Sequence, residues 1–281
     1  MKKIGFVDYY MSEWHANNYP AWIREACAEK GLDYEIAYAW AELDVSPLDG
    51  VTTDAWCEQF GVTKCQTLEE LCEKSDVILV LSPSNPEKHL PYAKVVLPYG
   101  KRTYIDKTFA PDLATAKEIF ALAEKYHTPF FSTSALRFAT ELLEYPDGKH
   151  LSTTGSGRSF DEYSVHQVEM IVKKLGMGAK RVRGFNTKMT SVVEIKFDDE
   201  RSATITYAVR GLPFTAYMAA GAERPVFFEV TSKYFDLLMR DIVRFFEEGT
   251  VSFDVAETLE VMKVREGALR ALETPGEWIE L

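Results

Sequence analysis

Short apolar runs alternate with amphipathic segments along the first half of the chain. The apolar runs predict strands at residues 4–7, 34–40, 76–82, 102–106 and 129–132. Helical spacing predicts helices between them, at residues 20–30, 68–72, 86–99 and 112–126. The run at 76–82 is almost wholly apolar, which is typical of a strand buried on both faces. This alternation predicts a parallel, doubly wound, Rossmann-like sheet in an α/β fold.

The pattern changes after Arg137. Residues 151–158 are rich in Ser, Thr and Gly, which predicts a loop or a crossing between domains. Strands are expected at residues 182–197 and 202–209, and helices at 160–175, at 234–248 and after Asp254. These elements predict a second, α+β domain with a mainly antiparallel sheet. We therefore expect two domains, at residues 1–137 and 138–281.

Composition and charge restrict the classes of partner. The chain has 281 residues, of which 46% are hydrophobic, enough for two cores. Its apolar stretches fall far below the roughly 20 residues that span a bilayer, and the N-terminus enters a strand pattern at once, so neither a membrane span nor an export signal is expected. A formal net charge of -11 opposes binding to nucleic acid or anionic lipid. A small-molecule substrate is expected instead. The four cysteines lack CxxC spacing, which suggests neither a zinc site nor a disulfide framework, so a cytoplasmic protein is expected.

Two motifs carry a resemblance to a known family. Residues 75–83 (SDVILVLSP), His89 and residues 100–108 (GKRTYIDKT) follow the order and spacing of a stretch that ends in Glu-Lys-Pro in the glucose–fructose oxidoreductase/inositol dehydrogenase (Gfo/Idh/MocA) family. Residues 162–169 (EYSVHQVE) resemble the family's Asp-x-Gly-x-His-x-x-Asp helix. The resemblance implies a nucleotide-binding first domain and a second domain for substrate binding and oligomerisation. It also implies oxidation or reduction of a sugar, cyclitol or similar hydroxyl by a homo-oligomer.

The cofactor motif is where the chain departs from that family. The register places Asp8, Tyr10 and Glu13 on the three glycine positions of the G-x-G-x-x-G turn. These glycines normally permit a tight turn and close approach of the backbone to the pyrophosphate, and two acids add repulsion. The resemblance implies NAD or NADP as cofactor, and the substitutions predict weak or absent binding. Further cofactor contacts are expected from four residues: Ser82, Pro83, Asn85 and Asp106.

The resemblance assigns proton transfer to Lys107, which would contact both nicotinamide and substrate, and to His166. An imidazole titrates near neutral pH and can take the proton of a substrate hydroxyl. Glu162 and Glu169 share a helical face with His166 and could tune it. We expect Lys107 and His166 to meet at one interdomain cleft. Thr108 replaces the family's proline, so a trans peptide bond is expected before it.

Three further residues are candidates for binding substrate. Arg137 matches an Arg of the family that faces the cleft, where it could hold a hydroxyl or carboxylate, and ordinary interdomain pairing is the alternative. Trp14 and His15, with Tyr19, could form an aromatic floor for a sugar-like ligand, or they could simply pack the domain.

Two other functions fit the same patterns. The first is a non-catalytic relative that has lost dinucleotide binding and serves as a ligand-binding or partner subunit. The second is an isomerase or hydrolase with a divalent metal held by Glu162, His166 and Glu169, for which no fourth ligand is evident. The sequence leaves the substrate, NAD versus NADP and the reaction direction open.

Overall fold

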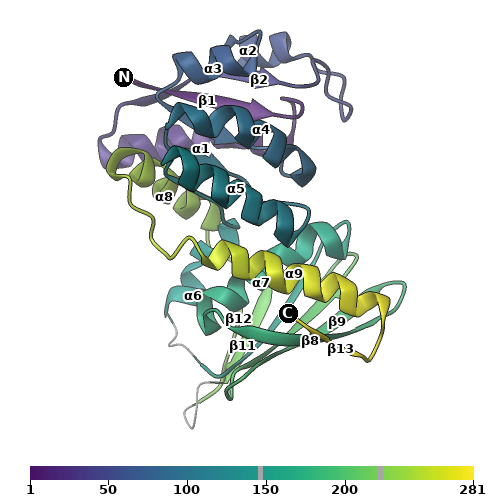
Figure 1. Ribbon diagram of the computed structural model, residues 1–281. Helices are drawn as coiled ribbons and strands as arrows, with labels where there is room; N and C mark the ends of the chain where they lie inside the picture. Colours follow the sequence, from purple (N-terminus) through teal and green to yellow (C-terminus); the bar gives the residue numbers. More distant parts are fainter. Residues whose placement is uncertain (145–147, 220–223) are drawn as a thin grey trace. The chain divides into compact units, whose positions relative to one another are not determined.

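The computed structural model describes residues 1–144, 148–219 and 224–281 (Figure 1). The chain forms two compact units. The first comprises Met1–Thr133 and Leu238–Phe253, and the second comprises Ser134–Leu237 and Asp254–Leu281. The expected division after Arg137 lies close to this boundary, but it does not include the return of the 238–253 segment to the first unit.

The first unit contains a six-stranded parallel sheet of order β3-β2-β1-β4-β5-β6. Its strands are β1 (Lys2–Asp8), β2 (Tyr34–Ala41), β3 (Thr63–Lys64), β4 (Val77–Val80), β5 (Thr103–Ile105) and β6 (Phe130–Phe131). Every residue of β4 is buried, as its apolar run predicts. The expected Rossmann-like sheet is therefore confirmed. Strand β3 has only two residues, too short for a hydrophobic period to mark it.

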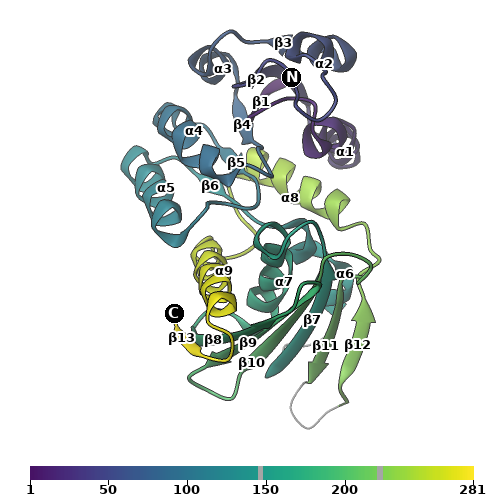
Figure 2. The same ribbon diagram turned by 90° about the vertical axis from the view of Figure 1, so that its right-hand side faces the viewer.

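Helices cover both faces of this sheet. They are α1 (Trp14–Lys30), α2 (Thr53–Phe60), α3 (Leu68–Lys74), α4 (His89–Val96), α5 (Leu113–Tyr126) and α8 (Tyr234–Glu248), with short 3-10 turns η1 (Pro86–Lys88) and η2 (Leu97–Tyr99). Helices α4 and α5 lie on one face, and α1 and α8 lie on the other (Figure 2). Helix α1 begins at Trp14, well before the expected start at Pro20. Pro20 lies inside the helix and does not mark its first turn.

The second unit contains a seven-stranded sheet of order β12-β11-β7-β10-β9-β8-β13. Its strands are β7 (His150–Ser156), β8 (Ala179–Asn186), β9 (Thr190–Phe197), β10 (Ser202–Ala208), β11 (Thr215–Ala219), β12 (Val226–Glu229) and β13 (Trp278–Glu280). All neighbours are antiparallel except the pair β7 and β10. The unit also has η3 (Ala135–Phe138), α6 (Thr140–Glu144), α7 (Phe160–Leu175) and α9 (Glu257–Glu273). The expected mainly antiparallel sheet is confirmed.

Two sequence expectations for this unit are wrong. Residues 151–158 were expected to form a loop or a crossing between domains, yet β7 lies inside the sheet between β10 and β11. Its buried and partly exposed residues alternate, but Ser, Thr and Gly fill so many positions that the hydrophobic period is hidden. Residues 182–197 were expected to form one strand, and they instead form two antiparallel strands, β8 and β9, joined by a short turn.

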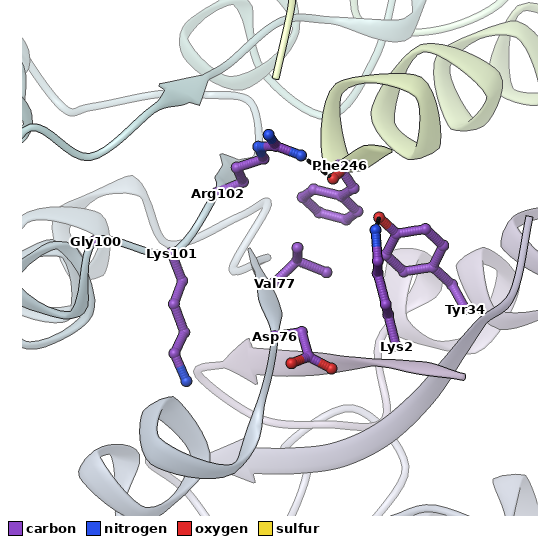
Figure 3. Close-up of a pocket in the computed structure, with 8 residues that line it drawn as sticks. All are labelled: Lys2, Tyr34, Asp76, Val77, Gly100, Lys101, Arg102 and Phe246. Carbon is purple, nitrogen blue, oxygen red and sulfur yellow. Dashed lines mark hydrogen bonds between the residues drawn. The ribbon is translucent and has the colours of Figure 1, made fainter. Parts of the chain in front are cut away.

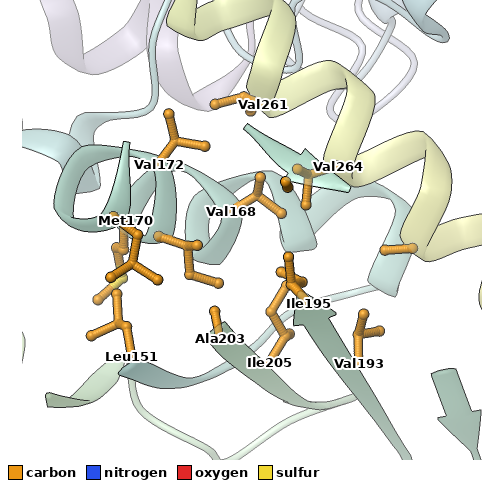
Figure 4. Packing of buried hydrophobic residues seen from close by; sticks show 14 of the residues in the cluster. Leu151, Val168, Met170, Val172, Val193, Ile195, Ala203, Ile205, Val261 and Val264 are labelled. Atoms are coloured by element: carbon orange, nitrogen blue, oxygen red, sulfur yellow. The ribbon is translucent and has the colours of Figure 1, made fainter. Parts of the chain in front are cut away.

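The core of the second unit lies between the sheet and two helices, as Figure 4 shows. Alternate strand residues such as Val193, Ile195 and Ile205 are fully buried, because successive side chains of a strand point to opposite faces. Val168 of α7 and Val264 of α9 pack onto them. Helix α7 is thereby fixed on the sheet, which positions its polar residues. In the part of the chain that the structure describes, no helix is both long and apolar enough to cross a bilayer.

Candidate functional site

The turn between β1 and α1 buries an aspartate. Asp8 is the last residue of β1 and is 1% exposed. Its Oδ1 accepts hydrogen bonds from the Tyr9 N–H at 2.6 Å, the Ser82 N–H at 3.1 Å and the Ser82 hydroxyl at 3.2 Å. Burial, and then the neighbouring Glu13 carboxylate, raise the pKa of Asp8 well above its ordinary value. Asp8 therefore links the carboxyl ends of β1 and β4 within the chain.

Glu13 caps helix α1. Its carboxylate accepts hydrogen bonds from the N–H groups of His15, at 2.8 Å, and Ala16. These are among the first N–H groups of the helix, which have no partner inside it. The Glu13 side chain is buried, and burial raises its pKa. The carboxyl group of a side chain thus occupies the N-terminus of α1.

His15 connects α1 to the end of β5. Its Nδ1 hydrogen-bonds to the carboxylate of Asp106, and the Tyr19 hydroxyl lies 3.2 Å from the same nitrogen. Burial would raise the pKa of Asp106, but the charge and hydrogen bond of His15 hold it below its usual value. The His15 ring stacks on Tyr19 with centroids 4.9 Å apart, while half-exposed Trp14 packs edge-on against it. The His15 ring therefore packs within the unit and Trp14 stays half-exposed, so the aromatic floor for a ligand stays a prediction.

The residues after β4 join the same edge of the sheet. Ser82 has a φ of 57°, unusual for a residue other than glycine, and its carbonyl accepts the Asn85 N–H at 3.0 Å. The Pro83 carbonyl accepts a hydrogen bond from Lys107 Nζ at 3.4 Å. Half-buried Tyr10 lies with its ring 5.8 Å from that of Tyr9. The structure thus brings most residues expected at the cofactor site to one edge of the first sheet.

Lys107 follows β5 at the carboxyl end of the sheet and is half-buried. Its N–H donates to Asp106 Oδ1 at 2.8 Å. The peptide bond between Lys107 and Thr108 is cis, so the expected trans bond is wrong. That expectation rested on the local preference of non-proline peptides alone, whereas the packing around buried Thr108 also decides the conformation.

In the second unit, His166 lies on α7 and contacts Ser134. The distance between Ser134 Oγ and His166 Nδ1 is 2.7 Å, and the rings of Tyr163 and Phe214 each lie 5.7 Å from the imidazole. Ser134 is fully buried and also accepts the Leu136 N–H at 3.2 Å, so its hydroxyl is held in place. No sequence motif marks Ser134, so its contact with His166 is not predictable from the sequence.

The two glutamates that flank His166 along α7 bind other partners. Glu162 forms an ion pair with Arg158, and buried Glu169 forms one with Arg137 at 2.5 Å. Over residues 1–144, 148–219 and 224–281, no group of three His, Cys, Asp or Glu side chains could hold a metal ion. The three ligands of the metal hypothesis therefore do not assemble in the structure, because Glu169 is committed to an arginine.

Arg137 is 2% exposed and lies in η3. Besides Glu169, its guanidinium contacts the Glu257 carboxylate of α9 at 2.7 Å. Both partners belong to the same unit as Arg137. These ion pairs differ from both readings of the sequence, which placed Arg137 on a substrate or on the other domain.

A pocket of about 340 Å³ lies at the opposite, amino edge of the first sheet (Figure 3). Its cations already have partners: Lys2 pairs with Glu247 at 2.7 Å, Arg102 donates to the Glu247 carbonyl at 2.9 Å, and Lys101 donates to the Glu73 carbonyl at 3.1 Å. Ligands of open α/β sheets bind at the carboxyl edge instead. This pocket therefore does not coincide with the candidate site, which lies at the other edge of the sheet.

A family model described as "Oxidoreductase family, NAD-binding Rossmann fold" matches residues 47–133. The resemblance to the Gfo/Idh/MocA family is confirmed. The uncharacterized oxidoreductase YhhX of Escherichia coli is 44% identical over 57 residues, which are 20% of this chain and 16% of that protein. The matched segment includes β3 to β6 and Lys107, but it excludes the β1–α1 turn.

Solved structures share the fold of the whole chain. A probable dehydrogenase from Thermotoga maritima has a TM-score of 0.78 at 14% identity, with 99% of this chain and 98% of that one covered. The scyllo-inositol dehydrogenase of Lactobacillus casei, solved with NAD(H) and scyllo-inositol, has a TM-score of 0.77 at 14% identity over 99% and 98%. GenD2 of gentamicin A biosynthesis, solved with NAD, has a TM-score of 0.80 at 14% identity over 100% and 97%.

The turn does not fit a dinucleotide bound in the family's usual way. In the Rossmann fold, the N-terminus of the first helix receives the pyrophosphate. Here the Glu13 carboxylate accepts the N–H groups of His15 and Ala16 at that place. Asp8 stands where the first glycine would permit the tight turn, and it is buried beside Glu13. The family has an NAD-binding fold, but this chain's turn is already filled by its own anion.

Proposed function

We propose that the protein oxidises or reduces a hydroxyl group of a sugar, cyclitol or related small molecule with NAD(H) or NADP(H), and that Lys107 and His166 handle the proton. The observation that carries the proposal is Lys107 at the carboxyl end of β5, within the segment that matches the oxidoreductase family. Open α/β sheets bind their ligands at this edge. The relatives solved with NAD give the proposal its cofactor class.

The proton chemistry follows from the two side chains. His166 takes the proton of a substrate hydroxyl, since an imidazole changes charge near neutral pH, and Ser134 orients its ring through Nδ1. The Lys107 ammonium, directed by the Pro83 carbonyl, donates a hydrogen bond to the reacting oxygen. That the two residues serve one substrate stays a prediction, because they belong to different units.

Turnover tests this proposal. The purified protein is incubated with NAD⁺ or NADP⁺ and a panel of sugars and cyclitols, and formation of the reduced nicotinamide is followed by absorbance. Lys107→Met and His166→Asn are each expected to lower the rate roughly 100-fold or more, as loss of a positioned proton-transfer group does. The matched controls are Lys117→Met, on the exposed face of α5, and His127→Asn, at its C-cap. Variants that keep the wild-type rate would overturn the assignment.

A second candidate is a non-catalytic relative, and one observation favours it: the Glu13 carboxylate at the N-terminus of α1. In that case the chain binds a small molecule or a partner protein without a dinucleotide. Calorimetric titration with NAD⁺, NADH, NADP⁺ and NADPH separates the two functions. Binding of any one with low-micromolar affinity supports the oxidoreductase, and no detectable heat with all four supports the non-catalytic relative.

A further inference from the structure

The N-terminus of α1 is already bonded to an anion of the chain itself. Glu13 is the N-cap residue, and its two carboxylate oxygens accept the N–H groups of His15 and Ala16. The first N–H groups of a helix, together with its dipole, form a natural anion-binding position. A diphosphate placed there in the usual way would need the same donors. Glu13 and a dinucleotide therefore compete for one position.

The surroundings hold Glu13 in that place. Its side chain is 6% exposed, so it makes little contact with water and its hydrogen bonds are to the backbone of the turn. Asp8 is a close neighbour, with Oδ1 bonded to Tyr9 and Ser82, and the Glu13 carboxylate helps to raise the pKa of Asp8. A diphosphate brings negative charge to a turn that already buries two acids, and the pKa of each is raised. The two buried acids and the hydrogen bonds already made by Glu13 therefore both oppose binding of a diphosphate in the turn.

We propose that Glu13 is a built-in occupant of the diphosphate position, so that a dinucleotide binds in the family's manner only when the Glu13 carboxylate leaves the N-terminus of α1. This inference rests on the proposed function and names the residue that limits its cofactor affinity. The general repulsion by acids at the glycine positions follows from the sequence. The structure adds that Glu13 itself takes the ligand's hydrogen bonds, which makes its removal the decisive change.

The test compares Glu13→Gly and Glu13→Gln with wild type. Calorimetry measures binding of NADH, NADPH and inorganic pyrophosphate, the last of which reports on the diphosphate position alone. Glu13→Gly frees both N–H groups, and we expect at least tenfold tighter binding of pyrophosphate and of one dinucleotide. Glu13→Gln keeps the size and one acceptor but loses the charge, and a smaller gain is expected. Asp112→Asn makes the equivalent change at the N-cap of α5 and is expected to leave the affinities for pyrophosphate and both dinucleotides unchanged.

Circular dichroism and thermal melting show which variants fold. If Glu13→Gly does not fold, the Glu13→Gln result decides, since it retains the side-chain volume. Affinities unchanged from wild type in the folded variants, or no binding by any of them, would overturn the inference. If Glu13→Gly gains affinity and no sugar or cyclitol is turned over, the inference stands and the proposed function fails. If wild type turns over a substrate and the variants bind no better, the function stands and the inference fails.

Discussion

The β1–α1 turn and the α7 region both bury ionisable side chains, but they stabilise them differently. In the turn, Asp8 and Glu13 lie close together, and backbone N–H groups supply much of their hydrogen bonding. In the α7 region, the Arg137 guanidinium faces the carboxylates of Glu169 and Glu257. Backbone donors at a helix start also attract ligand anions, whereas an Arg–carboxylate cluster needs no ligand. We therefore expect changes in the turn to alter cofactor binding and changes in the cluster to alter the stability of its unit.

The largest effect is expected from Arg137→Met. Removing the guanidinium leaves buried Glu169 and its neighbour Glu257 without their cation, which typically costs about 3–5 kcal/mol. Urea denaturation followed by circular dichroism measures the free energy of unfolding, with exposed Arg270→Met on α9 as the control. If Arg137→Met keeps its stability and loses affinity for substrate instead, the guanidinium serves a ligand and the comparison fails.

A second effect concerns pH and Asp8. The pKa of Asp8 is raised on folding, so between the unfolded and folded values the native state binds more protons than the unfolded state. Its contribution to stability is therefore complete below about pH 4 and is lost as pH rises towards the folded-state pKa. Asp8→Asn cannot ionise. Relative to wild type, we expect the stability of this variant to rise as the pH increases from 4 to 8, because only wild type loses the contribution of a protonated Asp8.

Denaturation across this pH range measures that difference. Exposed Asp198→Asn is the control, and its stability is expected to run parallel to that of wild type. A parallel profile for Asp8→Asn as well would mean that Asp8 titrates as it does in the unfolded chain. The β1–α1 turn would then hold an ordinary carboxylate, and the contrast with the Arg137 cluster would largely disappear.

Strongly apolar segments made much of the fold predictable from sequence. The apolar run around β4 predicts a buried parallel strand, and the apolar run before Lys107 predicts that this lysine follows a strand. The structure has both. Where packing uses small or hydroxylated residues the signal is lost. Strand β7 buries Thr153 and Gly155, and its sequence predicts a loop or a crossing between domains instead. Its pairing with β10, distant in sequence, supplies the order that local pattern could not show.

The candidate site was predictable by position but not by contact. Asp8 and Glu13 were recognised as obstacles at glycine positions, yet the capping role of Glu13 was missed because α1 was expected to start at Pro20. Glutamate is also not among the favoured N-cap residues. The ion pair of Arg137 joins η3 to α7 and α9 through tertiary packing, which a single sequence does not reveal.

The smallest effect is expected from Ser134→Ala. Ser134 Oγ contacts His166 Nδ1 at 2.7 Å, so it biases which ring nitrogen carries the proton. Loss of one hydrogen bond lowers stability by only about 1 kcal/mol, but the tautomer balance of His166 should shift, which nitrogen NMR of the labelled imidazole detects. Ser152→Ala, which removes a 2.9 Å contact to His150 Nε2, is the matched control and should move His150 alone. An unmoved His166 signal in Ser134→Ala would make Ser134 a cap of η3 only, and His166 would then owe its orientation to the rings of Tyr163 and Phe214.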